Sequence, residues 1–290
     1  MGNCCGTQEQ TIKKKFAIKF PNGHHYIYYD EKTKEFIKGP TIDTWIQNLY
    51  CVGNHNNWVV YNDDTHKLGN KHTTHGHCKG IISWSYDTIG WLCHSVPNFP
   101  KNFRGTSISL IESGEIIYGQ SFQYFEIPYS EKMLYDILHQ LYIMDANIYN
   151  NNYTNDFIKY KDIEFPKIIK INVLKLSEDI VHIAKPYNIH IDIYSDYIAR
   201  NSSCKWKVES WIRGYHINNK NDMIVDICTL QYENIRYTSH QDHSKWAVSN
   251  MNYYWVGDLN RMTSQYNRGG GGFICNDMDI VKVLNNIIID

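Results

Sequence analysis

The stretch Gly76-His77-Cys78-Lys79-Gly80 has a counterpart later in the chain, Asp242-His243-Ser244-Lys245-Trp246. Both contain a histidine and a lysine separated by one residue. In both, a short apolar run follows, which predicts a β-strand that begins at the motif. Side chains at positions i and i+2 of a strand point to the same face. Each motif therefore directs an imidazole and an ammonium group toward one site.

The surroundings of the two motifs share one register. A polar residue stands at a predicted strand end 17 residues after each motif histidine, His94 after His77 and Asn260 after His243. The motifs themselves are 166 residues apart. A duplicated unit of this kind predicts two pseudo-symmetric halves with the site on the axis between them. We therefore expect the four motif side chains to converge in one cleft.

Apolar patterning predicts strands and helices on both sides of an Asn- and Tyr-rich loop at 147–155. The expected strands are 16–20 and 26–29, joined as a hairpin by Asn22-Gly23, then 58–61, 80–84, 90–94, 167–174, 246–249 and 253–256. The expected helices are 131–143, 177–184, 191–199 and 277–288. The mixture predicts an α/β or mixed α+β fold, with a β-sheet flanked by helices in each half. We place a disordered tail at 1–14, the first half at about 15–146 and the second at about 156–290.

Charge argues against a protein held on nucleic acid by bulk positive potential. The 290 residues include 29 Lys and Arg against 30 Asp and Glu, a formal charge of -1. The 14 histidines titrate near pH 6.5 when unperturbed, so the chain becomes net positive in mild acid. A polyanionic substrate is therefore expected to bind better in acid, although most of these histidines are ordinary surface or core residues.

The first residues show no apolar segment typical of a secretory signal peptide. Nowhere in the 290 residues is there a run of 18 apolar residues that would predict a transmembrane helix. From this we expect a cytoplasmic location. Gly2 resembles a myristoylation site, but Gly6 stands where Ser or Thr is usual. Cys4, Cys5 and the basic run 13–15 would supply a second signal, so weak membrane attachment is the alternative to a floppy tail. The eight cysteines lack CxxC spacing and indicate neither a zinc ribbon nor a disulfide scaffold.

Six strings, in order from about residue 15 to 290, resemble the deoxyribonuclease II family, which has a phospholipase D-like fold. They are Gly76-His-Cys-Lys-Gly80, His94-Ser-Val-Pro-Asn-Phe-Pro100, Tyr118-Gly-Gln-Ser121, Asp242-His-Ser-Lys-Trp246, Gly257-Asp-Leu-Asn-Arg261, and Arg268-Gly-Gly-Gly-Gly272 with Cys275. The resemblance implies a metal-independent DNA endonuclease that leaves 3′-phosphate ends.

The chain departs from the family pattern in three respects. The aspartate that the wider superfamily has downstream of each lysine is replaced by Trp84 and Asn250. In many members a cysteine follows the second motif and pairs with a cysteine near the Gly-rich run. In this chain that position is Ala247, which leaves Cys275 without that partner. The family is usually lysosomal or secreted, at odds with the missing signal segment.

Phosphodiester cleavage needs a nucleophile, an acid for the leaving oxygen and positive charge for the phosphate oxygens. We assign His77 as the nucleophile, forming a phosphohistidine, and His243 as the general acid; the reverse assignment stays open. Lys79 and Lys245 supply the charge that other nucleases take from Mg²⁺. No cofactor is expected, DNA is the expected partner, and the duplicated site predicts a monomer.

Several neighbouring residues are expected to assist or to be structural. His94 and Asn260 would donate hydrogen bonds to the phosphate or orient the histidines, and Asp258 would orient a histidine or tie down a loop. Arg261 is expected to be structural. The run 269–272 lacks the lysine and Ser/Thr of a P-loop and is expected to be a tight loop. Four tryptophans alternate along strands and are expected in the core rather than stacked on bases: Trp84, Trp91, Trp246 and Trp255.

Two other enzymes and one non-enzyme remain open. A zinc hydrolase would use His72, His75 and His77, with His94 and Cys51 near them. Another phospholipase D-like phosphodiesterase would share the motifs but not the substrate. A degenerate DNA-binding relative is the third alternative, against which both motifs are intact.

Overall fold

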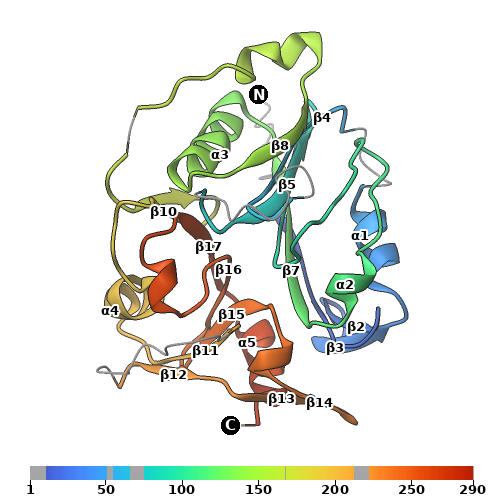
Figure 1. Cartoon of the computed structure of the whole chain (residues 1–290), viewed down its shortest axis with the longest axis vertical. Helices are drawn as coiled ribbons and strands as arrows, with labels where there is room; N and C mark the ends of the chain where they lie inside the picture. The colour runs from blue at the N-terminus through green and yellow to red at the C-terminus, as the bar shows by residue number, and fades with distance from the viewer. Residues whose placement is uncertain (1–10, 51–54, 66–74, 167, 212–221, 290) are drawn as a thin grey trace, which may run out of the picture.

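The computed structural model describes residues 11–50, 55–65, 75–166, 168–211 and 222–289, and two large β-sheets dominate it (Figure 1). Within these residues the larger sheet has eight strands: β1 (Lys13–Lys19), β2 (Tyr26–Asp30), β3 (Glu35–Gly39), β4 (Asn57–Asn62), β5 (Lys79–Trp84), β6 (Thr88–His94), β7 (Gln120–Pro128) and β8 (Ile148–Asn152). The second sheet has seven: β9 (Asn172–Lys175), β10 (Ile180–Lys185), β11 (Trp206–Ser210), β12 (Ile224–Asp226), β15 (Lys245–Ser249), β16 (Tyr253–Gly257) and β17 (Gly270–Asn276).

The remaining elements are short. Strands β13 (Thr229–Tyr232) and β14 (Ile235–Thr238) form a separate hairpin. The α-helices are α1 (Ile42–Tyr50), α2 (Ser113–Ile116), α3 (Glu131–Ile143), α4 (Arg200–Ser202) and α5 (Met278–Asn286). Short helices of other types are η2 (Asn155–Tyr160), η3 (Ile193–Ala199), η4 (Ser239–Gln241) and η5 (Thr263–Gln265), of which η3 is π-helical.

The strand order is β3-β2-β1-β7-β6-β5-β4-β8 in the larger sheet and β12-β11-β15-β16-β17-β10-β9 in the second. Among the described strands only β11 and β12 pair in parallel. The neighbouring strands β1-β7-β6-β5 of the larger sheet match β10-β17-β16-β15 of the second. In each set the first strand comes earliest in the chain, and the other three are the next strands of the set in reverse chain order. Antiparallel sheets with helices on their faces make this an α+β protein.

The main core lies between the two sheets. Trp91 and Phe125 of the larger sheet contact Phe273 of the second, with ring centroids 4.8 Å and 4.6 Å apart. His182 of β10 is buried in the same place, its ring 4.6 Å from that of Trp91. Apolar side chains of α3 and α5 complete this cluster. The two sheets are therefore fastened face to face by aromatic packing.

The outer face of each sheet is covered by a helical segment (Figure 1). Helix α1 packs Trp45, Ile46 and Leu49 against the larger sheet. On the opposite side of the molecule, η3 packs Ile193 and Ile198 against the second sheet. Both sheets are thus buried on two faces around their central strands.

Most of the expected elements are confirmed. The hairpin at 16–29 is present as β1 and β2, with Asn22 in the left-handed region at φ 59°. Helix α3 spans the predicted range, and its N-cap Ser130 accepts a hydrogen bond from the Met133 N–H at 3.1 Å. The four tryptophans named above are fully buried in the core, as expected.

Four expectations are wrong. The helix predicted at 177–184 is strand β10, because a central strand is apolar on both faces and its run resembles a buried helix. The loop predicted at 147–155 contains the edge strand β8, which is held by pairing to β4 and not by propensity. The Gly-rich loop is the start of β17, and the tail predicted at 1–14 ends before β1 begins at Lys13.

Two N-terminal expectations fall partly outside the described residues. Gly2, Cys4 and Cys5 lie in the undescribed segment 1–10. The basic run 13–15 lies on β1, where Lys13 pairs with Glu126 at 2.6 Å. Among the described helices, none has the length and apolarity of a membrane span.

The glycines of β17 are required by the close approach of neighbouring strands. A Cβ at Gly271 would lie 2.3 Å from the carbonyl oxygen of Ile183 on β10, and a Cβ at Gly272 would lie 2.5 Å from Cα of Gly257 on β16. Backbone atoms cannot yield as a flexible side chain can. The run therefore brings three strands together next to the second motif's strand.

Gly271→Ala should destabilise the protein by at least about 1–3 kcal/mol, the usual cost of forcing extra volume into a packed interior. The matched control is Gly114→Ala in α2, where an added Cβ has no neighbour within 4 Å. Urea denaturation of both variants measures the difference. Equal midpoints for the two variants would contradict the close-approach explanation.

Candidate active site

His77 belongs to the larger sheet by sequence but is held by the second. Its backbone N–H donates to the Gly269 carbonyl at 2.8 Å, and its Nδ1 lies 2.6 Å from the backbone oxygen of Asp258. A carbonyl can only accept, so the proton of the neutral ring resides on Nδ1 and Nε2 carries the lone pair. Burial, followed by the charge of Lys79, holds the pKa of His77 well below its ordinary value. The ring is therefore neutral and its Nε2 is available as a base or nucleophile.

Lys79, the first residue of β5, is anchored by a carboxylate. Its ammonium group donates to Asp63 Oδ1, and Arg268 donates to Asp63 Oδ2 at 2.9 Å. Burial would raise the pKa of Asp63, but the charges of Lys79, His77 and Arg268 outweigh it and keep the carboxylate ionised. The site thus contains a cation–anion–cation chain contributed by both sheets, in which Lys79 and Asp63 are buried and Arg268 is partly exposed.

His243 sits in an aromatic clamp. Its ring stacks on Tyr118 with centroids 4.0 Å apart and lies 4.3 Å from the ring of Trp211. Its Nδ1 is 3.8 Å from a carboxylate oxygen of Glu115. Its backbone N–H donates to the Gly119 carbonyl at 2.9 Å. The environment of this histidine therefore differs from that of His77, although the two backbone contacts match.

Lys245, the first residue of β15, donates through its ammonium group to the carbonyl of His243. Burial first, and then the positive charge of Lys79, lower its pKa to about 7. The charge of Lys245 in turn contributes to the lowered pKa of His77. Lys79 and Lys245 are thus close enough to His77 to influence its charge, and the backbone of His243 is bound across the junction of the two sheets at Gly119.

His94 and Asn260 are both buried, His94 as the last residue of β6 and Asn260 three residues beyond the end of β16. His94 packs between Phe99 and Phe122, and its Nδ1 accepts the Val96 N–H at 3.2 Å, so its proton resides on Nε2. Burial, then Lys79, lower the pKa of His94 to about 3, so the ring is neutral. His94 Nε2 and Asn260 Oδ1 have no hydrogen-bond partner among the described residues. Both are polar atoms that a substrate could satisfy.

Asp258 combines the two roles considered for it. Its carbonyl orients His77, while its carboxylate accepts the N–H groups of Lys79 and Gly271, each at 3.3 Å. Burial, the largest influence, raises its pKa to about 7. Arg261 is structural as expected, because its guanidinium pairs with Asp192 at 3.2 Å and with Asp226 at 2.5 Å.

Sequence reasoning missed the partners of the motif residues. Asp63 follows β4 and reaches Lys79 only because Asn62 of β4 pairs with Lys79 across the sheet. Glu115 and Trp211 carry no motif. Tyr118 and Arg268 belong to the family strings, and each stands directly before a glycine whose carbonyl accepts the N–H of a motif histidine.

The zinc alternative falls partly outside the described residues, since His72 and Cys51 are not described. His75 faces Asp145 at 3.4 Å, whereas the Nδ1 of His77 faces the Asp258 carbonyl. Within the described part of the chain, no three His, Cys, Asp or Glu side chains are arranged to hold a metal ion. A chelator experiment is the direct test of this alternative.

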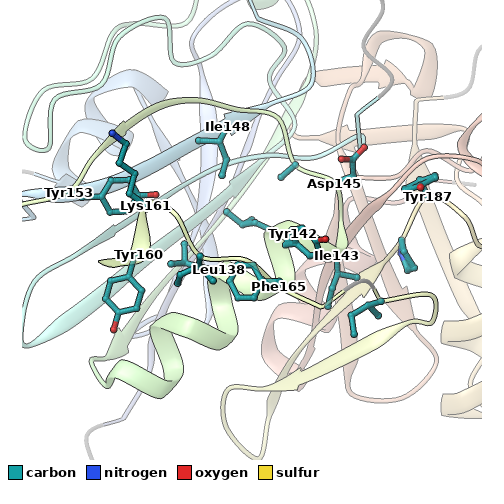
Figure 2. Close-up of a pocket in the computed structure, with 15 residues that line it drawn as sticks. Leu138, Tyr142, Ile143, Asp145, Ile148, Tyr153, Tyr160, Lys161, Phe165 and Tyr187 are labelled. Atoms are coloured by element: carbon teal, nitrogen blue, oxygen red, sulfur yellow. The ribbon is translucent and has the colours of Figure 1, made fainter. Parts of the chain in front are cut away.

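A separate cavity of about 330 Å³ lies between α3 and the segment at 160–165, with Ile168 also in its wall. Figure 2 shows Tyr142, Phe165 and Tyr187 among its lining residues. It borders the motif region at Asp145, whose carbonyl accepts the Gly76 N–H at 2.9 Å. None of the four motif side chains lines it, so the junction of the sheets is the candidate active site.

Two histidines with neighbouring ammonium groups suit an enzyme of phosphoryl transfer. The chain belongs to the deoxyribonuclease II family, whose model matches residues 3–290. Similar proteins include deoxyribonuclease-2-beta of Mus musculus, 30% identical over 292 residues that cover 87% of this chain and 78% of that protein. Deoxyribonuclease-2-alpha of Sus scrofa is 27% identical over 312 residues, with 92% and 84% covered. Cell-death-related nuclease 7 of Caenorhabditis elegans is 26% identical over 298 residues, with 92% and 79% covered.

Glu115 should make stability depend on pH, because burial raises its pKa from 4.5 to about 7. Between these values the unfolded chain has ionised while the native carboxyl keeps its proton, so its contribution to stability falls as pH rises. Glu115→Gln removes this slope. Between pH 4.5 and 7 the free energy of unfolding of the variant should rise by about 1–3 kcal/mol relative to that of the native protein. Urea denaturation at pH 4 to 8 measures it, with exposed Glu178→Gln as control, and a flat difference would contradict the prediction.

Proposed function

We propose that this chain is an endonuclease that hydrolyses DNA phosphodiester bonds without a metal ion, through a phosphohistidine intermediate, and works best in acid. Membership of the deoxyribonuclease II family supports DNA as the substrate. The observation that carries the mechanism is the tautomer of His77, whose Nδ1 is engaged by the Asp258 carbonyl and whose Nε2 has the lone pair. A neutral, oriented imidazole is what a nucleophilic histidine requires.

In the first step, His77 Nε2 attacks phosphorus and forms a P–N bond. The bond from phosphorus to the 5′-oxygen breaks, and His243 gives its proton to that oxygen. The products are a DNA 5′-hydroxyl and a phosphohistidine that still carries the 3′-oxygen. The reverse assignment of the two histidines remains the alternative, and the Asp258 carbonyl, which leaves the lone pair of His77 on Nε2, favours the first.

In the second step, water attacks the phosphorus of the intermediate. His243, now neutral, takes the proton of the water, and the P–N bond breaks with its electron pair returning to Nε2 of His77. The DNA leaves with a 3′-phosphate, and the enzyme returns to its initial protonation state. Lys79, Lys245 and the Nε2–H of His94 would stabilise the charge on the phosphate oxygens in both steps.

We further propose that the two sheets form pseudo-symmetric halves of a phospholipase D-like fold, with the site on their common axis and a monomer as the active unit. The support is the matched succession of central strands and the exchanged backbone contacts. His77 donates to Gly269 of the second half, and His243 donates to Gly119 of the first.

The motif residues should separate catalysis from stability. His77→Ala and His243→Ala should each lower the rate of plasmid cleavage by several orders of magnitude, because both act in the same displacement. Lys79→Ala and Lys245→Ala should cost roughly 10²–10³-fold. His75→Ala is the matched control and should be mild. Equal losses at His75 and His77, together with loss of native activity in EDTA, would favour a zinc hydrolase; cleavage of phospholipid but not DNA would favour another phosphodiesterase.

Activity should fall as pH rises through about 7, where Lys245 loses the charge that binds phosphate. An arginine at this position keeps its charge throughout this pH range. The alkaline limb of the kcat/KM profile of Lys245→Arg should therefore shift to higher pH. Lys79→Arg is the control and should leave that limb in place. The shapes of the profiles from pH 4 to 9 decide the matter, and a native rate that climbs steadily to pH 9 would refute the assignment.

A further inference from the structure

Two buried lysines outside the motifs occupy matching places in the two sheets. Lys19 is the last residue of β1 and Lys185 the last residue of β10. Lys19 pairs with Gln120, the first residue of β7, and Lys185 pairs with Gly270, the first residue of β17. They are 166 residues apart, the separation of the two His-x-Lys motifs. Both side chains are fully buried.

The ammonium group of Lys19 binds backbone carbonyls. It donates to the carbonyl oxygens of Phe20 at 2.8 Å, Gly23 at 2.9 Å and Ile116 at 2.8 Å. The first two lie in the turn after β1, and the third lies in the segment that leads into β7. Lys19 therefore ties the segment at 116–119 to the end of β1.

Lys185 makes the equivalent contacts in the second sheet. It donates to the carbonyl oxygens of Tyr266 at 2.9 Å and Arg268 at 2.6 Å. Both lie in the segment that leads into β17. The segment at 266–269 is therefore tied to β10 as the segment at 116–119 is tied to β1.

Each tied segment contacts the motif histidine of the other sheet. The segment at 116–119 stacks Tyr118 on His243 and accepts that histidine's N–H at Gly119. The segment at 266–269 accepts the His77 N–H at Gly269, and its Arg268 binds Asp63 beside Lys79. The contacts thus lead from Lys19 in the first half to His243 in the second, and from Lys185 in the second half to His77 in the first.

A buried ammonium group that meets carbonyls in place of a carboxylate is costly to desolvate. Among the described residues neither lysine forms an ion pair, and burial lowers the pKa of each to about 8. Asp242, Asp43 and Glu115 offset part of that effect at Lys19. Both lysines therefore remain charged in the acidic range where the proposed reaction runs. Backbone carbonyls in a segment without regular secondary structure lack strand or helix N–H partners. One ammonium group has three N–H donors and can therefore bind several such carbonyls at once.

We propose that Lys19 and Lys185 are positioning residues that act crosswise: Lys19 sets His243 through the segment at 116–119, and Lys185 sets His77 through the segment at 266–269. The inference rests on the proposed function for the chemistry of the two histidines. Neither lysine touches a reacting atom. Lys19 should affect only the role of His243, and Lys185 only the role of His77.

The test compares two substrates with the full-length chain at pH 5. One is a DNA oligonucleotide, whose 5′-oxygen needs a proton on leaving; the other is thymidine 3′-(p-nitrophenyl phosphate), whose activated leaving group does not. The measured quantity is kcat/KM, which reports steps up to the first bond cleavage. Lys19→Met should lose about 10–100-fold on DNA, the scale expected for a misplaced reacting group, and much less on the activated ester. Lys185→Met should lose a similar factor on both, because the nucleophile is needed for both.

His243→Ala and His77→Ala in the same assay supply the reference patterns. Each lysine variant must follow the pattern of its own histidine, Lys19 that of His243 and Lys185 that of His77, even if the acid and nucleophile are reversed. If neither histidine variant changes cleavage, the proposed function fails, whatever the lysine variants do. Lys19→Gln and Lys185→Gln keep two donors and replace the methionine variants if those fail to fold. Exposed Lys38→Met is the control for loss of a positive charge.

Equal losses on both substrates for both lysine variants would overturn the proposal, because a general loss of folded protein lowers both rates alike. So would activity within about twofold of the native protein on DNA, the usual limit for uncoupled sites.

Discussion

The site depends on a pair of backbone hydrogen bonds that cross between the sheets, from His77 to Gly269 and from His243 to Gly119. A side chain on a strand end inherits the position of its backbone. These two bonds therefore fix both imidazoles relative to each other, although the histidines are far apart in sequence. The aromatic packing of Trp91 and Phe125 against Phe273 keeps the two sheets in the register that the bonds require. Neither sheet alone would hold its own histidine in place.

The same closeness forces an electrostatic compromise. Lys79, Lys245 and Arg268 bring three basic groups into a buried junction, and the ionised Asp63 offsets part of that charge. The remaining carboxyls, Glu115 and Asp258, keep protons to about pH 7 because burial disfavours their ionised forms. Acid therefore removes little charge from the anchoring aspartate and adds charge to Lys245. The junction is arranged to be most cationic when the pH is low.

Much of the site could be predicted from sequence because its core is local and repeated. The spacing of His77 to Lys79 defines one face of a strand, and its recurrence at His243 marks the pair as more than chance. The partners could not be predicted, since Asp63 meets Lys79 only through the pairing of β4 with β5. Strand β10 was mistaken for a helix because both of its faces are buried, a fact that only the sheet order reveals.

The unequal surroundings of the two histidines have a consequence for the direction in which a nucleic acid strand can lie. A truly symmetric junction would receive a phosphodiester in either polarity, and its two products would be mixed. Here one imidazole faces a backbone carbonyl and a buried ion chain, and the other is stacked on Tyr118 beside Glu115. In the proposed reaction only one polarity sets the leaving oxygen against the proton donor. Two nearly symmetric halves whose histidines have different surroundings would thus bind a DNA strand in one direction only. That direction would determine which product end keeps the phosphate.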